Sequence, residues 1–466
     1  MSDWATYLAD NRQTILDDYF ALLRIPSISA LPQHADDVRR AARWVADRAT
    51  RAGLENVRIM DTGGHPVVYG DRLHAPGKPT FLLYGHFDVQ PVDPVDLWTS
   101  PPFEPTVREG RVYARGASDM KGNLLLQLAA LEALRETTGE LPVNVKLFYE
   151  GQEEIGSPQV PAFLTKQRDL FACDLVISGD SGQYDEQTPE LSLGARGLAA
   201  LEIDMTGASS DLHSGLFGGA VQNPLHALVQ LLGSMRGPNG RILVEGFYDD
   251  VRPLSDEERA MIARYPFDGA TFKAELGVDE LFGEEGYSPI ERMWARPTLE
   301  LNGLWGGFQG QGSKTVLPNE AHAKITCRLV PNQDPDRIRA LLRAHVERHR
   351  PPGVRVSLGD RTGGAKPYLI PADHWGNRVA AAVLKELYGR EPLHVRSGGT
   401  VPVMDLFKTT LGAETVGFGF GQDDEHFHAP DEFMRLANFE RGLRGYCVLF
   451  QHLGAASPAS SGTGSR

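Results

Sequence analysis

The feature that most constrains the fold is an alternation of helical and buried-strand patterns over about the first 195 of the 466 residues. Apolar residues recur at helical spacing over residues 4–23 and again over 36–52. A short, apolar strand pattern follows at residues 79–89, and a strongly helical segment (123–137) then precedes an alternating strand pattern (143–151). This order of elements predicts a layered α/β domain with a parallel-rich sheet.

The pattern changes from Gly197 onward, which predicts a second domain. Strand and helix patterns succeed one another there, at residues 197–207, 220–235, 321–331 and 335–349. Between them, residues 237–297 are rich in glycine, proline and acidic residues and fit neither period, so we expect an insertion with short helices. Helix and strand patterns return after Gly363. The chain closes on a polar segment (454–466) that predicts a disordered tail.

The net charge of the chain indicates which class of molecule the protein binds. The chain has 47 Lys and Arg residues against 61 Asp and Glu residues, which gives a formal net charge of −14. Proteins that bind nucleic acid usually carry an excess of basic residues, so this balance argues against such a partner and favours small molecules. Hydrophobic residues make up 41% and charged residues 23%, an ordinary composition for a globular protein.

The sequence also predicts a cytoplasmic protein without membrane segments. Apolar runs such as FLLYG break far short of the roughly 18 to 20 residues that a membrane helix needs. The first residues mix acid, amide and arginine, where a secretory signal would place a basic start and an apolar stretch. Cys173, Cys327 and Cys447 are odd in number and widely spaced, which we interpret as reduced core thiols.

Histidines and carboxylates follow several of the predicted strands. His86 and Asp88 lie in GHFDVQP, where an imidazole can bind a metal while the carboxylate orients it, although a single histidine there is also compatible with a packed core residue. Asp119, in GASDMKG, precedes a long helix and can serve as a helix cap or lie near a metal. Glu153 and Glu154 are adjacent and would repel each other unless a cation or solvent separates them.

Two further segments add to this set. Asp180 follows the apolar run DLVIS, at a strand end, and DEHFHAPDE supplies His426 and His428. Oxygen and imidazole donors without thiolate suit zinc, manganese or cobalt. The set suggests a two-metal hydrolase, in which the metals polarise a carbonyl and lower the pKa of a bridging water. One glutamate of the Glu153 and Glu154 pair would then move the proton from that water to the leaving amine.

Six motifs in order resemble those of one enzyme family. GHFDVQP, GASDMKG, EGQEEIGS, DLHSGLFGG, GGTVPV and HAPDE look like the motifs of the co-catalytic di-zinc metallopeptidases, a family of aminoacylases, carboxypeptidases and carnosine dipeptidases. The similarity runs from about residue 11 to about residue 453 and is greatest to the cytosolic non-specific dipeptidase branch. The resemblance implies a catalytic α/β domain with a mixed, mostly parallel sheet between helices, interrupted by an α+β lid and dimerisation domain.

The resemblance also implies roles for the residues at the strand ends. His86 and Asp180 would hold one divalent metal ion and Glu154 and His428 the other, with Asp119 bridging the two. The resemblance further implies that Glu153 is the general base, that Asp88 orients His86 and that the peptide bond after Asp119 is cis. His426 is the alternative to His428. We prefer His428 because an acid and then a glutamate follow this histidine in HAPDE. Zinc is the expected metal, with manganese or cobalt as alternatives.

Substrate contacts are implied in the same way. His213, in DLHSG, matches a histidine that reaches into the active site of the partner subunit and stabilises the oxyanion, which implies a homodimer. Arg328 matches the residue that binds the terminal carboxylate of the substrate, a task suited to a guanidinium group. Further hydrogen bonds are expected from Thr315, Gly399 and Thr400, and a weaker contact from His374.

The expected domains are a catalytic domain in two parts (1–196 and 364–453), a lid and dimerisation domain (197–363) and a tail (454–466). An enlarged lid looks like that of the dipeptidase branch and favours short substrates. We therefore expect a metal-dependent dipeptidase. The alternative within the family is a deacylase of N-acyl or N-succinyl amino acids, and the alternative outside it is an inactive scaffold, which the complete set of predicted ligands opposes.

Overall fold

A computed structural model of the chain describes residues 3–359 and 364–456. The chain forms two compact units. The first comprises Met1–Leu193, Ile370–Val395 and Leu406–Arg466, and the second comprises Gly194–Leu369 and Arg396–Asp405. The predicted domain boundary at residue 363 and most of the predicted tail, from residue 457 on, lie outside the described residues.

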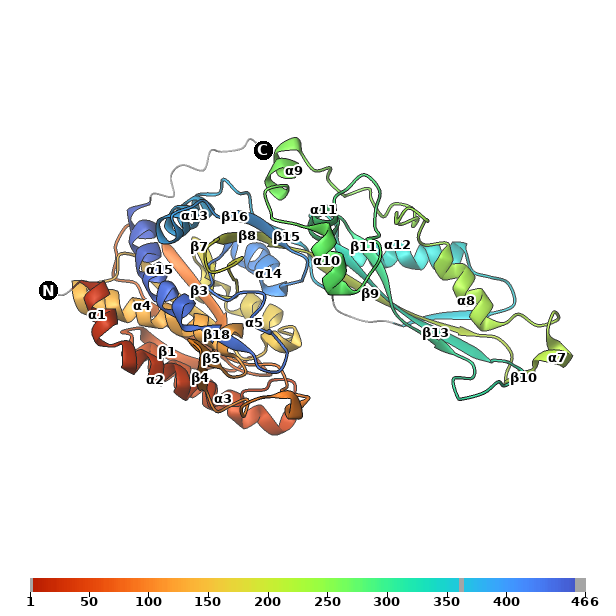
Figure 1. Cartoon of the computed structure of the whole chain (residues 1–466), viewed down its shortest axis with the longest axis horizontal. Coiled ribbons are helices and arrows are strands. Elements are labelled where there is room, and N and C mark those ends of the chain that lie inside the picture. Colours follow the sequence, from red (N-terminus) through yellow and green to blue (C-terminus); the bar gives the residue numbers. More distant parts are fainter. Residues whose placement is uncertain (1–2, 360–363, 457–466) are drawn as a thin grey trace. The chain divides into compact units, whose positions relative to one another are not determined.

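A six-stranded sheet forms the centre of the first unit, and it is mixed and mostly parallel, which confirms the predicted fold class (Figure 1). Its strands, in spatial order, are β1 (Glu55–Met60), β2 (Val67–Arg72), β6 (Asn144–Glu150), β3 (Thr80–His86), β7 (Leu175–Ser178) and β17 (Thr415–Gly417). β3 pairs in parallel with both β6 and β7, and β17 pairs in parallel with β7. β2 pairs antiparallel with β1 and β6. After Thr80, every residue of β3 is buried, as expected of a strand covered on both faces.

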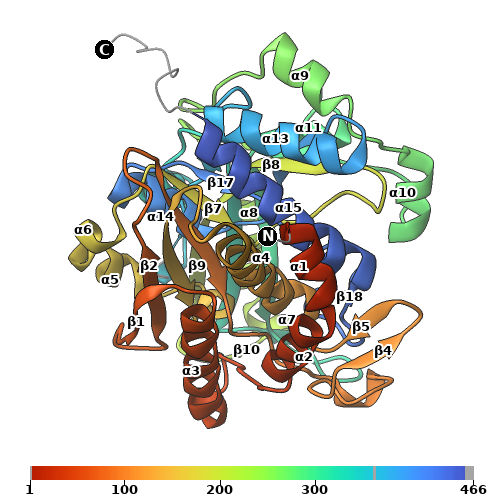
Figure 2. The same cartoon turned by 90° about the vertical axis from the view of Figure 1, so that its left-hand side faces the viewer.

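Helices accompany this sheet. They are α1 (Trp4–Asp10), α2 (Arg12–Leu23), α3 (Ala35–Arg51), α4 (Gly122–Thr138), α5 (Val160–Lys166), α6 (Arg168–Phe171), α13 (Trp375–Tyr388) and α15 (Leu436–Ala455). α4 is almost entirely buried and lies alongside α15 (Figures 1 and 2). A Cβ atom on Gly442 of α15 would lie 2.3 Å from Leu126 of α4, so this glycine permits the close approach of the two helices.

The predicted helix over residues 4–23 is two helices in the structure. α1 ends and α2 begins at Asn11, whose side-chain amide donates a hydrogen bond to the carbonyl of Tyr7 at 2.9 Å. Asparagine bonds readily to nearby backbone groups and so favours helix ends over helix interiors.

A small antiparallel sheet joins two distant segments of the first unit. Its strands, in spatial order, are β18 (Phe433–Arg435), β5 (Arg111–Tyr113) and β4 (Thr106–Arg108). β18 pairs with β5 in the register Phe433 to Tyr113. This pairing brings the segment before residue 433 beside the segment after residue 113, in which Asp119 lies.

The second unit contains a four-stranded antiparallel sheet with helices on one face. The strands, in spatial order, are β11 (Thr298–Gly306), β13 (Glu320–Leu329), β9 (Gly197–Thr206) and β14 (Arg355–Gly359), and the helices are α8 (Pro224–Gly233) and α12 (Pro335–Arg348). Buried and half-exposed residues alternate strictly along β9. The buried set, with Ile203 and Ile325 at its centre, packs against Leu228 of α8 and Leu342 of α12 (Figure 1).

Residues 237–297 contain short helices, as expected: α9 (Asp256–Ile262), α10 (Gly269–Leu276) and α11 (Pro289–Ala295). The remaining elements are short. They are β8 (Glu190–Ala195), β15 (Tyr368–Leu369), β16 (Leu393–Ser397), β10 (Leu212–His213), β12 (Val316–Leu317), α7 (Ser214–Phe217), α14 (Pro402–Leu411), η1 (Pro32–His34), η2 (Val95–Leu97), η3 (Ala117–Lys121) and η4 (Glu153–Ile155). Among the described residues, no helix has the length and apolar character to cross a membrane.

Candidate metal centre

The site begins at the carboxyl ends of three neighbouring parallel strands. β3 ends at His86, β6 is followed by Glu153 and Glu154 in η4, and β7 is followed by Asp180. Because β3 lies between β6 and β7 and runs parallel to both, these ends meet at one edge of the sheet. In α/β proteins this edge is the usual place for a functional site.

Asp119 and His428 complete the site from outside the sheet. Potential ligand atoms of His86, Asp119 and Asp180 lie within 4.8 Å of one another, and so do those of Asp119, Glu154 and His428. His86 Nε2 lies 3.2 Å from one carboxylate oxygen of Asp119, while His428 Nε2 lies 2.9 Å from the other. Asp119 thus belongs to both groups, with one oxygen toward each, which is the position of a bridging ligand.

The chemistry of these donors fits divalent metal ions. The five residues offer imidazole nitrogen and carboxylate oxygen and no thiolate, a set suited to zinc, manganese or cobalt. Burial, reinforced by the charge of Asp119, raises the pKa of Asp180 to about 6 and also raises the pKa of Glu154. Three carboxylates gathered away from water repel one another, and bound cations would remove that cost.

Asp88 fixes the orientation of two parts of the site. It is fully buried, and its two carboxylate oxygens accept hydrogen bonds from the backbone N–H groups of Glu153 and Glu154 at 3.2 and 3.1 Å. Its carbonyl oxygen lies 3.1 Å from His86 Nδ1, so the opposite nitrogen, Nε2, faces Asp119. Asp88 therefore contacts both His86 and the backbone of the glutamate pair, and the second of these contacts was not indicated by the sequence.

Glu153 has the environment of a general base. Burial is the main cause that raises its pKa well above the ordinary value, and the nearby carboxylates of Asp180 and Glu154 add to the shift. Its own carboxylate makes no side-chain hydrogen bond with any residue in the described part of the chain. A carboxylate with a raised pKa and free oxygens is suited to accept and return a proton near neutral pH.

Comparison with known proteins identifies the family. The family model described as peptidase family M20/M25/M40 matches residues 82–452. The Cys-Gly metallodipeptidase dug1 of Schizosaccharomyces pombe is 32% identical over 93% of this chain and 94% of its own. The chain belongs to peptidase family M20/M25/M40. Human Beta-Ala-His dipeptidase is 29% identical over 91% of this chain and 86% of its own, in keeping with the predicted dipeptidase branch.

Solved structures agree with the family assignment. The M20 family metallo-carboxypeptidase Sso-CP2 from Sulfolobus solfataricus superposes with a TM-score of 0.84 at 34% identity, over 95% of this chain and 99% of its own. The M20 peptidases are metal-dependent hydrolases of peptide bonds. Membership of this family confirms two predictions from the sequence, the enzyme class and the need for metal.

Glu432 supports the M20 centre in a way that the sequence did not reveal. One of its carboxylate oxygens accepts hydrogen bonds from the backbone N–H groups of Ser118 and Asp119, both at 3.1 Å. The other accepts from the N–H of Gly116 at 2.9 Å and from the Arg115 guanidinium at 2.7 Å. Glu432 thereby fixes the turn that carries Asp119, whose peptide bond to Met120 is cis, as the resemblance implied.

Further support comes from residues that sequence reasoning missed. Glu425 accepts hydrogen bonds from the Ser118 hydroxyl and from the backbone N–H of Gln422 and Arg435. Gln90 donates to the Glu154 carboxylate at 2.9 Å. Glu425 lies next to His426 in the sequence, and Gln90 lies in the GHFDVQP motif, so proximity to predicted ligands is the signal that marks both.

The structure separates the two candidate histidines of the HFH segment. His428 lies in the second ligand group, 3.2 Å from Glu154 Oε2. His426 is in neither group, and its ring packs edge-on against Phe433 with the centroids 5.6 Å apart. Both residues have a positive φ, a conformation uncommon outside glycine.

Most of the predicted substrate contacts lie in the second unit, where they form two clusters. His213 is exposed at the end of β10, and the adjacent N–H of Ser214 donates to the Thr315 carbonyl at 3.0 Å. Arg328 of β13 donates to the Thr400 hydroxyl at 2.6 Å, beside Gly399. His374 lies in the first unit, where its ring accepts a hydrogen bond from Gly376 N and caps α13, so the structure gives it a capping role.

Proposed function

We propose that this M20 peptidase hydrolyses dipeptides at a two-metal centre held by His86 and Asp180 on one side and by Glu154 and His428 on the other. The observation that carries the proposal is the position of Asp119, whose two oxygens face the two groups. Dipeptidases among the relatives cover nearly the whole chain, which supports a dipeptide substrate.

The chain's own residues account for the movement of protons. Bound metal ions would polarise the scissile carbonyl and lower the pKa of water. Glu153 takes the proton from that water and passes it to the nitrogen of the leaving amino acid. Burial raises the pKa of Glu153, which makes its carboxylate a stronger base toward that water.

We further propose zinc as the metal, with manganese and cobalt as alternatives, because all three accept the same nitrogen and oxygen donors. The free state of Cys173, Cys327 and Cys447 supports the proposal of a cytoplasmic protein, where thiols stay reduced. Fractionation of cells that express the native protein would test this location.

A homodimer would complete the active site. The second unit exposes several large apolar side chains, among them Leu216 (75% exposed), Leu301 (50%) and Leu304 (47%), as protein interfaces often do. We propose that His213 crosses this interface and stabilises the oxyanion in the partner's site. Arg328 would bind the terminal carboxylate of the substrate, with hydrogen bonds from Thr315, Gly399 and Thr400.

The test is hydrolysis of a panel of Ala-Ala, Ala-Ala-Ala, N-acetylalanine and N-succinylalanine by chelated protein and by protein refilled with zinc or manganese. Refilled protein is expected to cleave Ala-Ala fastest, and Glu153→Gln is expected to lower kcat by about 10² to 10⁴-fold while both metals remain bound. Cleavage of the acylated amino acids alone would replace the dipeptidase with the deacylase. No cleavage by protein with two metals bound would refute hydrolysis.

Mixing two inactive variants tests the dimer. Glu153→Gln and His213→Ala chains are each expected to be nearly inactive. In a mixed dimer, one site combines an intact Glu153 with an intact His213 from the partner subunit, so activity should return on mixing. If mixing restores nothing although the chains exchange, His213 does not act across the interface.

A further inference from the structure

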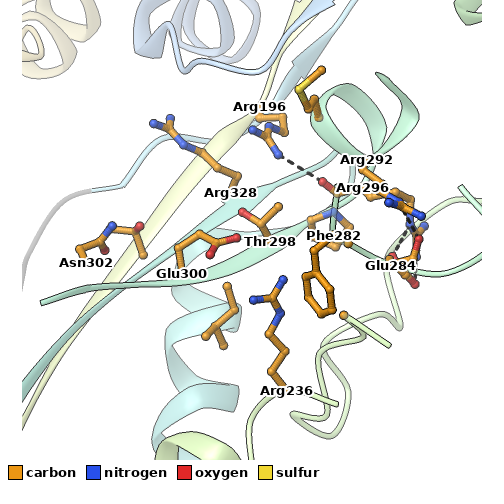
Figure 3. Close-up of a pocket in the computed structure, with 16 residues that line it drawn as sticks. Arg196, Arg236, Phe282, Glu284, Arg292, Arg296, Thr298, Glu300, Asn302 and Arg328 are labelled. Atoms are coloured by element: carbon orange, nitrogen blue, oxygen red, sulfur yellow. Dashed lines mark hydrogen bonds and ion pairs between the residues drawn. The ribbon is translucent and has the colours of Figure 1, made fainter. Parts of the chain in front are cut away.

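A cavity of about 390 Å³ in the second unit is lined by five arginines (Figure 3). They are Arg196, Arg236, Arg292, Arg296 and Arg328. The lining includes only two acidic residues, Glu284 and Glu300. Because guanidinium groups stay charged at all physiological pH values, the cavity has a marked excess of positive charge.

Glu284 does not neutralise the centre of this cavity. Its carboxylate forms a bidentate pair with Arg296 at 2.7 and 2.9 Å and also accepts from Arg241 at 3.1 Å. Within the described part of the chain, Arg196, Arg236 and Arg328 form no ion pair with a carboxylate. In the same part of the chain Arg292 also forms no ion pair with a carboxylate, and it donates to the Glu284 carbonyl at 2.8 Å. Four guanidinium groups therefore remain without a counter-ion, against the single carboxylate of Glu300.

Arg236 is held in place by packing. Its backbone forms a bridge with Ile242, and the ring of Phe282 lies 4.8 Å from its guanidinium carbon. In Figure 3 its guanidinium points into the cavity, between Phe282 and Glu300. The surrounding wall is tight, since a Cβ atom on Gly240 would lie 2.5 Å from the backbone of Gly283. Among the residues that the structure describes, the Arg236 guanidinium has no hydrogen-bond or ion-pair partner, so it can bind an anion.

Arg196 and Arg328 form the other cationic side of the cavity. Arg196 Nε donates to the Gly398 carbonyl at 3.0 Å, and Arg328 donates to the Thr400 hydroxyl at 2.6 Å. Burial lowers the pKa of Arg196 to about 10, and the neighbouring charge of Arg328 lowers it further in the same direction. Two like charges held close together by neutral partners favour an anionic ligand that pairs with both.

We propose that this cavity binds a dicarboxylate, namely the C-terminal residue of a dipeptide whose side chain is acidic. The terminal carboxylate pairs with Arg328 and Arg196, and the side-chain carboxylate pairs with Arg236. The assignment of Arg328 to the terminal carboxylate rests on the proposed function above. Arginine suits both tasks because its planar group binds a carboxylate through two parallel hydrogen bonds.

The first test compares kcat/KM for Ala-Glu and Ala-Gln, which have nearly the same shape and differ in charge. Ala-Glu is expected to be favoured by about 10 to 100-fold, because its side-chain carboxylate forms a charge pair with Arg236 that Ala-Gln lacks. Arg236→Met should abolish this preference through KM and leave kcat/KM for Ala-Gln within about threefold. Arg355→Met, an exposed arginine of β14, is the matched control and should preserve the preference.

The second test needs no turnover. Calorimetry on the metal-loaded protein measures binding of L-glutamate, L-glutamine and inorganic phosphate. Glutamate is expected to bind at least tenfold more tightly than glutamine, and Arg236→Met should remove that difference. Tight binding of phosphate without a preference for glutamate would overturn the dicarboxylate assignment.

The two tests distinguish the possible failures. If dipeptides are cleaved but Ala-Glu is not preferred and Arg236→Met changes nothing, the inference is wrong and the proposed function stands. If no dipeptide is cleaved while glutamate binds through Arg236, the proposed function is wrong and the dicarboxylate site stands. An Arg236→Lys variant, which keeps the charge, should retain part of the preference and excludes a loss caused by misfolding.

Discussion

The metal centre of the first unit and the arginine cavity of the second unit have opposite charge imbalances. In the metal centre, five carboxylates, Asp88, Asp119, Glu153, Glu154 and Asp180, lie with two histidines at one edge of a sheet. In the cavity, four arginines that form no ion pair among the described residues face the single carboxylate of Glu300. Each imbalance is costly in isolation and indicates a ligand of opposite charge, which is a cation in the first unit and an anion in the second.

The two regions also differ in how they are held. His86, Glu154 and Asp180 lie at or after the ends of strands of the central sheet, and the turn that carries Asp119 is fixed by backbone N–H groups that donate to the buried carboxylate of Glu432. The arginines of the cavity come from strand β13, helix α11 and loops, and Arg236 packs against an aromatic ring. The metal centre is therefore the more rigid region, and changes there should have larger effects.

The largest effect is expected from Asp119→Ala, because this change removes the residue common to both ligand groups. The variant should lose both metal ions and all measurable hydrolysis. Metal content measured by mass spectrometry, together with kcat for Ala-Ala, checks the prediction. Asp36→Ala, which removes an exposed carboxylate on α3, is the control and should keep both metals. Retention of two ions by Asp119→Ala would refute the bridging role.

A smaller effect is expected from Glu432→Gln. The amide keeps the size of the side chain but has one acceptor oxygen in place of two, so it cannot accept hydrogen bonds from all four of its present donors. Changes to groups that orient metal ligands typically weaken metal binding by about 10 to 100-fold. Metal titration against a competing chelator measures this loss. An unchanged affinity together with lower stability would make Glu432 a structural residue only.

Candidate residues for the metal centre could be selected from the sequence because each occupied a recognisable place. His86, Asp119, Glu153, Glu154, Asp180 and His428 follow strands or lie in short motifs, and the structure brings them together, although their roles stay a prediction. The family, the fold class and the metallopeptidase chemistry were confirmed. Alternation of buried and half-exposed residues likewise marked β9.

Other features could not be read from the sequence because they depend on distant partners. Glu432 bonds to backbone groups that precede it by 313 to 316 residues, and no local pattern encodes such a contact. Arg236 follows helix α8 as an ordinary basic residue, and its place in the cavity depends on residues that are distant in sequence, such as Phe282 and Glu300. The break at Asn11 was missed since the apolar spacing continues through it.

The smallest expected effect is on stability as a function of pH. It separates the two regions because burial shifts the pKa of carboxyl groups in the metal centre, whereas the arginines of the cavity keep their charge. In the metal-free chain, burial raises the pKa of Asp180 to about 6, above its ordinary value of 3.8. A raised carboxyl pKa stabilises the folded state below pH 3.8 and loses this contribution as the pH rises through about 6. The ionisation of Asp180 should therefore lower the Tm of the metal-free protein as the pH rises from 4 to 6.5.

Bound metal should cancel that contribution, since a cation stabilises the ionised carboxylate and removes the cause of the shift. Calorimetric scans of metal-free and metal-loaded protein across this pH range provide the measurement. Asp180→Asn, which cannot ionise, should flatten the metal-free profile, whereas Arg236→Met should leave it unchanged because arginine keeps its charge throughout. If the dependence of Tm on pH is the same with and without metal, or if Arg236→Met alters it, the contrast between an acid-rich centre and a permanently cationic cavity is wrong.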